Sequence, residues 1–123
     1  MAQTVKWLPR PEKHAFQAAE DYLSLIMPAK RAAEWRKKLT AARHDITHRK
    51  ARDILRASQL DLLGEDNKHV AADLRKAASG TALSPILLLR GDEGHPLIVA
   101  DGYHRVCASY WIDENTDIPC ILI

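Results

Sequence analysis

The chain has 123 residues, of which 46 % are hydrophobic, so it is long enough to bury one core without disulfides or metal ions. Its net charge of +2 hides an asymmetry, because residues 1–60 hold 13 Lys and Arg against 6 Asp and Glu, whereas residues 61–123 hold 5 against 10. No apolar stretch approaches the roughly 20 residues of a membrane-spanning helix, and residues 1–11 lack the apolar core of a secretory signal, so we expect a cytoplasmic protein that does not cross a membrane.

The basic half of the chain, residues 1–60, has the apolar spacing of helices. The first helix is predicted from about Pro11, and Pro28 ends it or starts the next. Its apolar positions recur at three-and-four spacing and are Ala15, Ala18, Ala19, Tyr22, Leu23 and Ile26. A second helix is predicted over residues 29–42, with a narrow stripe of Ala32, Trp35 and Leu39, and a third over residues 47–58. Residues 1–60 therefore predict an all-helical layer.

In the acidic half, residues 61–123, the predicted secondary structure changes from helix to strand. Asn67 is a good N-cap for a helix over His69–Ala78, and Gly80 ends that helix. Two short apolar strands follow, Pro85–Leu89 and Leu97–Ala100, joined as a hairpin through a turn at residues 91–94. A helix over Tyr103–Ile112 and a strand over Ile118–Ile123 close the chain. The predicted fold class is α+β, in a single domain.

The corner Asp101-Gly102 is the best candidate for a binding site, since it lies where a strand is predicted to give way to a helix. Unpaired amides at a helix N-terminus bind phosphate or carboxylate, and His104 and Arg105 in the first turn add further donors. A cation there opposes the helix dipole at a cost of about 0.3–1 kcal/mol unless an anion or an acid lies nearby. Asp101 could cap the helix, hold Arg105 or coordinate a metal ion carried by a nucleotide. The alternative is a capped helix with His and Arg on its surface.

Three stretches around this corner resemble the ParB/sulfiredoxin superfamily. They are Gly80-Thr81-Ala82-Leu83-Ser84-Pro85-Ile86-Leu87-Leu88-Leu89, Ile98-Val99-Ala100-Asp101-Gly102-Tyr103-His104-Arg105-Val106-Cys107-Ala108, and Ile118-Pro119-Cys120-Ile121-Leu122. The resemblance covers residues 65–123. It implies a small ParB/sulfiredoxin-like sheet with packed helices that binds a nucleotide, ATP or CTP with Mg²⁺, through Gly102, Tyr103, His104 and Arg105.

Two departures narrow what the resemblance implies. Tyr103 stands where the sulfiredoxin branch has its catalytic cysteine, which argues against reduction of sulfinic acids. The DNA-reading helix-turn-helix domain of the partitioning branch is not expected, because the chain ends after the closing strand. A nucleotide-dependent enzyme and a nucleotide-controlled switch both stay open, and in an enzyme Asp101 is the candidate catalytic acid or base. The resemblance also implies further nucleotide contacts from the helix before the sheet, whose candidate residues are Lys68, His69 and Lys76; the alternative is a solvated helix surface.

The basic half leaves an alternative function open. Residues 29–56 could contact nucleic acid in a DNA-binding or nuclease-like ParB-family protein, pair with the acidic half, or form a solvated helix surface. The N-terminal helices could also cover the sheet, form a homo-oligomer through Trp35 or, in a structural or adaptor module, bind another protein. Cys107 and Cys120 lack the spacing of a zinc or redox motif, so we expect partly buried, reduced thiols and no protein metal site.

Overall fold

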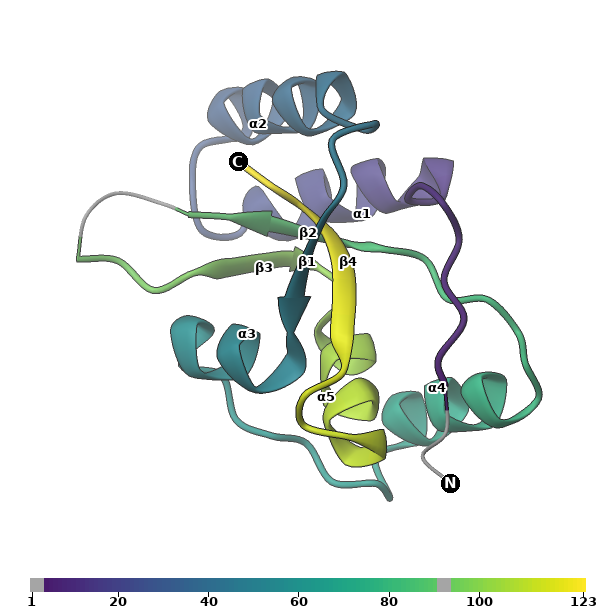
Figure 1. The fold of residues 1–123 in the computed structure, drawn as a ribbon. Coiled ribbons are helices and arrows are strands. Elements are labelled where there is room, and N and C mark those ends of the chain that lie inside the picture. The colour runs from purple at the N-terminus through teal and green to yellow at the C-terminus, as the bar shows by residue number, and fades with distance from the viewer. Residues whose placement is uncertain (1–3, 91–93) are drawn as a thin grey trace.

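The computed structural model describes residues 4–90 and 94–123. These residues form five helices and a four-stranded mixed sheet, which confirms the α+β class (Figure 1). The elements in chain order are α1 (Lys13–Leu23), α2 (Ala29–Ala41), β1 (Thr47–Lys50), α3 (Ala51–Ser58), α4 (Lys68–Ala78), β2 (Ile86–Leu89), β3 (Ile98–Asp101), α5 (Tyr103–Ile112) and β4 (Asp117–Leu122). None of the helices within the described residues is long and apolar enough to cross a bilayer.

The sheet has the order β1-β4-β2-β3. The central strands β2 and β4 run parallel, with Ile86 opposite Cys120, and α5 lies in the crossover between them. The two outer strands pair antiparallel, β3 with β2 and β1 with β4. The predicted hairpin of β2 and β3 is therefore confirmed, although residues 91–93 of its connecting turn lie outside the described residues.

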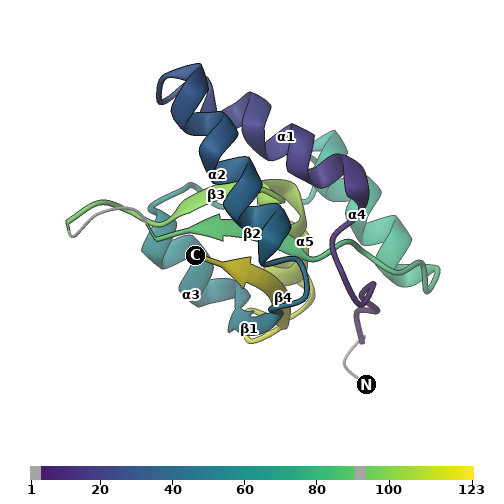
Figure 2. The ribbon, with the colours of Figure 1, turned by 90° about the horizontal axis from the view of Figure 1, so that it is seen from above.

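Two layers of helices cover the two faces of the sheet, with α1 and α2 on one face and α3, α4 and α5 on the other (Figures 1 and 2). The alternation of side chains along β2 explains its unbroken apolar run. Ile86 and Leu88 point into the core with α3, α4 and α5, whereas Leu87 and Leu89 point into the core with α1 and α2. Cys107 and Cys120 are free thiols, and both are fully buried rather than partly buried as expected.

The N-terminal half differs from its prediction at residues 47–50. This segment was expected to open a helix, but it forms the edge strand β1, and only residues 51–58 are helical. The pairing of Arg49 with Ile118 of β4, far along the chain, outweighs the helical spacing of the local sequence. The layer formed by residues 1–60 is therefore not all-helical, because it supplies one strand of the sheet.

The first helix also ends earlier than its pattern indicates. Helix α1 stops at Leu23, and Tyr22 and Ile26, which were expected on its buried face, are 42 % and 51 % exposed. Phe16 is buried in their place. Helices α4 and α5 match their predictions closely. Asn67 Oδ1 accepts hydrogen bonds from the amides of His69 and Val70 at 3.0 and 3.2 Å, and Gly80 follows α4 with a φ of +78°.

Candidate functional site

The predicted corner between a strand and a helix is present at Gly102. Asp101 is the last residue of β3, and Gly102 precedes α5 with a φ of +115°. A Cβ atom at this position would overlap Cγ2 of Ile86 and lie 2.8 Å from its Cβ. Gly102 is therefore required by its backbone conformation and by the close packing of the corner on β2.

The N-terminus of α5 has no side-chain cap. Its first internal hydrogen bond runs from the amide of Val106 to the carbonyl of Gly102, at 3.0 Å. The preceding amides, those of Tyr103, His104 and Arg105, donate to no acceptor within residues 4–90 and 94–123. Amides of this kind are the donors that helix N-termini offer to anions.

Arg105 is turned inward and joins three segments. Its Nη2 donates to Oδ2 of Asp101 at 2.6 Å, and its Nη1 donates to the carbonyl of Ser84 at 2.5 Å. Only 16 % of the Arg105 side chain and 20 % of the Asp101 side chain are exposed. Much of the donor capacity of the guanidinium is therefore used within the protein, and Asp101 is engaged as its partner.

Tyr103 likewise makes a structural contact. Its hydroxyl donates to the carbonyl of Asp61 at 2.5 Å and so fixes the segment that follows α3. Burial, followed by the nearby Cys107 and Asp61, raises the pKa of Tyr103. The backbone of Tyr103 borders the site, while its hydroxyl is committed elsewhere.

A hollow of about 240 Å³ lies in front of the α5 N-terminus. It is lined by Asp101 to Arg105 and, from α4, by His69, Ala72, Asp73 and Lys76. Two of the three α4 residues considered from the sequence, His69 and Lys76, thus reach the site, and Lys68 does not. The rings of His69 and His104 lie 4.7 Å apart between centroids. Burial, then the neighbouring His69, lowers the pKa of His104, although Asp73 opposes this shift.

Asp73 is the site residue that the sequence analysis missed. It is half-buried, and no hydrogen bond or ion pair is formed by its carboxylate within the described part of the chain. Burial raises the pKa of Asp73, and the charges of Arg105 and Lys76 partly oppose this effect. Its spacing from His69 and Lys76, four and three residues on one helix, was the available signal that it shares their face.

A second hollow, of about 260 Å³, adjoins the first and shares Asp73, Lys76, Asp101 and Arg105 with it. Its other wall includes Glu12, His14 and Ala15 from the start of α1, a helix that also lacks a side-chain cap. The amide of Glu12 donates to Oγ of Ser84 at 3.0 Å, which anchors this end of α1 beside the site. Two uncapped helix N-termini therefore open on neighbouring hollows.

The chemistry of this arrangement suits an anion rather than a bare metal ion. Among the residues that the structure describes, no group of three or more His, Cys, Asp or Glu side chains is placed to hold a metal. Amides, two histidines and Lys76 can donate to phosphate oxygens, and Asp73 supplies one free carboxylate.

Comparison with known proteins adds no further constraint on this site, because the chain matches no family model, no curated protein and no solved structure.

Proposed function

We propose that the protein is a ParB-like nucleotide-binding domain that holds the phosphates of its ligand at the N-terminus of α5. The observation that carries the proposal is the set of amides at Tyr103, His104 and Arg105, which donate to no acceptor among the described residues and open on a hollow lined by His69 and Lys76. Phosphate at this position would accept from the amides and lie in the favourable end of the helix dipole. Arg105 then acts chiefly by positioning the corner, since its donors hold Asp101 and Ser84.

The ligand in this proposal is ATP or CTP with Mg²⁺. A lone carboxylate such as Asp73 repels phosphate unless a cation lies between them, and Mg²⁺ is commonly bound by one or two carboxylates together with phosphate oxygens and water. Asp73 is better placed for this task than Asp101, which is paired with Arg105. In an enzyme the same carboxylate could accept the proton of an attacking hydroxyl, whereas a switch would need only the binding step.

Calorimetric titration with ATP, CTP, ADP and GTP in the presence of Mg²⁺ tests the proposal. The informative variant is Lys76→Gln, and Lys68→Gln is its matched control, because both lysines are on α4 and only Lys76 lines the hollow. We expect at least one nucleotide to bind, Lys76→Gln to weaken binding about tenfold, a loss worth ~1.4 kcal/mol, and Lys68→Gln to leave it within twofold. Absence of heat with every nucleotide, or an equal loss in both variants, would refute the proposal.

Release of inorganic phosphate from the bound nucleotide separates the enzyme from the switch. Sustained turnover that Asp73→Asn abolishes supports an enzyme. Binding without turnover supports a switch. Arg105→Ala is a poor first variant for either question, because it also removes the bonds to Asp101 and Ser84.

The nucleic-acid alternative receives less support from the arrangement of charges. Lys50 lies 3.9 Å from Asp117, and Arg52 lies 3.8 Å from Glu114, so the basic half partly pairs with the acidic half. The basic residues of α2 and of α3 are also divided between the two helical layers. A gel shift that weakens with salt and with charge reversal at Lys37, Lys38 and Arg49 would restore this alternative.

We also propose a cytoplasmic location. Its support is the pair of unpaired thiols, Cys107 and Cys120, in the core of a chain that contains no other cysteine.

A further inference from the structure

A separate hollow, of about 430 Å³, lies at the other end of β3. Ile98, at the start of β3, lines this hollow, whereas Asp101, at the end of the strand, lines the candidate phosphate site. The two sites therefore share a strand and no lining residue. The volume falls within the roughly 300–1,000 Å³ that is usual for small-molecule sites.

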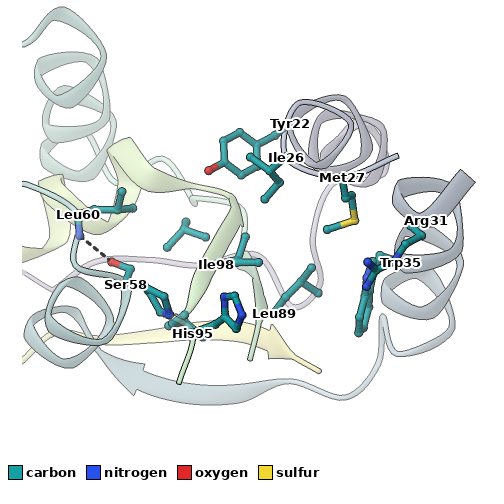
Figure 3. Close-up of a pocket in the computed structure, with 13 residues that line it drawn as sticks. Tyr22, Ile26, Met27, Arg31, Trp35, Ser58, Leu60, Leu89, His95 and Ile98 are labelled. Atoms are coloured by element: carbon teal, nitrogen blue, oxygen red, sulfur yellow. Dashed lines mark hydrogen bonds between the residues drawn. The ribbon is translucent and has the colours of Figure 1, made fainter. Parts of the chain in front are cut away.

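The walls of this hollow are mainly apolar and come from both helical layers (Figure 3). Tyr22, Ile26 and Met27, around the end of α1, face Leu60 and Ser58 across the opening, with Ile98 between them. Tyr22, Ile26 and Leu60 are 42 %, 51 % and 36 % exposed. Large apolar side chains gathered around one opening, unlike scattered ones, are typical of a binding site.

Arg31 is a positively charged residue in the lining of the hollow. His95 also lines it, and no Asp or Glu of residues 4–90 and 94–123 does. Arg31 lies beside Trp35 on the wall formed by α2, whereas His95 lies in the segment that leads into β3 (Figure 3). The ammonium of Lys38 lies 4.5 Å from the centre of the Trp35 ring and adds a further positive charge nearby. An apolar hollow with a cationic rim is complementary to a molecule with an apolar body and one anionic group.

We propose that this hollow binds a small organic carboxylate with an aromatic or branched aliphatic body, with the carboxylate at Arg31 and the body between Ile26, Met27 and Ile98. A planar guanidinium offers a carboxylate two parallel donors, whereas a lysine offers a point charge, which makes Arg31 the principal anchor. This proposal stands independently of nucleotide binding.

Calorimetry with two matched probes, 4-phenylbutyrate and 4-phenylbutan-1-ol, tests the proposal on the full chain. The probes share one apolar body and differ in charge. We expect the carboxylate to bind at least tenfold more tightly than the alcohol, and Arg31→Gln to remove that preference while leaving the affinity for the alcohol within twofold. Lys30→Gln is the matched control, since it removes the same charge from the preceding residue of α2, which does not line the hollow.

Ile26→Glu tests the position of the apolar body. Because Ile26 is half-exposed, the variant should fold normally, which thermal unfolding checks, and it should lose both probes. Saturating ATP with Mg²⁺ should leave the affinity for 4-phenylbutyrate unchanged, because the two sites share no residue. Failure of both probes to bind, equal affinity for acid and alcohol, or equal losses in Arg31→Gln and Lys30→Gln would each overturn the proposal.

Discussion

At Gly102 two separate effects oppose any side chain. The φ of +115° strains every residue with a Cβ, and that Cβ would also overlap Ile86 of the neighbouring strand. We expect Gly102→Ala to lower the free energy of unfolding by about 2–6 kcal/mol, from backbone strain and overpacking of about 1–3 kcal/mol each. Urea denaturation measures this change.

Gly80→Ala is the control for Gly102→Ala. Gly80 also has a positive φ, +78°, but an added Cβ would meet only Nζ of Lys6 at 3.6 Å, an ordinary contact. It should therefore cost only the backbone term, about 1–2 kcal/mol. Equal losses in the two variants would show that packing against Ile86 does not restrict Gly102.

The carboxylate of Asp73 is expected to lower the stability of the folded protein, although it contributes to the proposed nucleotide binding. Because burial raises the pKa of Asp73 above 3.8, the folded protein binds a proton more readily than the unfolded chain does just above that pH. The unfavourable contribution of the carboxylate is therefore fully present above the folded pKa and disappears as the pH falls through the folded and then the unfolded pKa. Asp73→Asn should raise the urea midpoint at pH 7 and lose this advantage in acid.

The same substitution should weaken Mg²⁺-dependent nucleotide binding, because it removes the free carboxylate of the site. Glu65→Gln, at an exposed acid before α4, should change neither the midpoint nor the binding. A lower midpoint for Asp73→Asn at pH 7 would mean that attraction to Arg105 and Lys76 outweighs burial, contrary to the direction of the pKa shift.

At the scale of elements, α4 presents His69, Asp73 and Lys76 to the site and depends on its cap. Oδ1 of Asn67 accepts from two amides of the first turn. We expect Asn67→Ala to reduce the free energy of unfolding by about 1 kcal/mol, within the range of 0.5–2 kcal/mol for such caps. Asn115→Ala is the control, since the Asn115 side chain is exposed and caps no helix; a similar loss there would count against the cap.

Most elements could be predicted from the sequence because their signals are local. The cap at Asn67, the apolar run of β2 and the spacing along α5 each lie within a dozen residues. Strand β1 could not be predicted, because Thr-His-Arg-Lys carries no apolar alternation and its partner, β4, lies almost 70 residues further on. Edge strands are often of this polar kind.

The features of the candidate site also differ in whether a local signal in the sequence predicts them. The corner at Gly102 was visible as a change of pattern within the sequence. The inward turn of Arg105 toward Ser84 and the approach of Asp73 to α5 both depend on how separate elements pack. A single sequence carries no direct signal for such contacts. The sequence therefore predicts Asp101 as the acid or base, whereas in the described part of the chain Asp101 pairs with Arg105 and Asp73 has no partner.

At the scale of the whole molecule, the question is whether the two helical layers unfold together. The N-terminal half reaches both layers and the sheet: α1 and α2 cover one face, β1 pairs with β4, and α3 lies on the other face. The backbones of Leu8 and Leu83 are also joined by a hydrogen bond of 2.8 Å beside the site. These links argue that residues 1–60 are integral to the folded unit rather than appended to it.

Two adjacent leucines of β2 offer a direct test of whether the two helical layers unfold cooperatively. Leu87 and Leu88 are both fully buried, Leu87 against α1 and α2 and Leu88 against α3 to α5. Each substitution to alanine should cost about 2–5 kcal/mol. If the layers form one cooperative unit, both variants should keep a single urea transition with the wild-type slope, whether followed by far-UV circular dichroism or by tryptophan fluorescence. A second transition in Leu87→Ala alone would instead show that α1 and α2 unfold separately, since only that core would have lost packing while the core that supports α4 and α5 stayed intact.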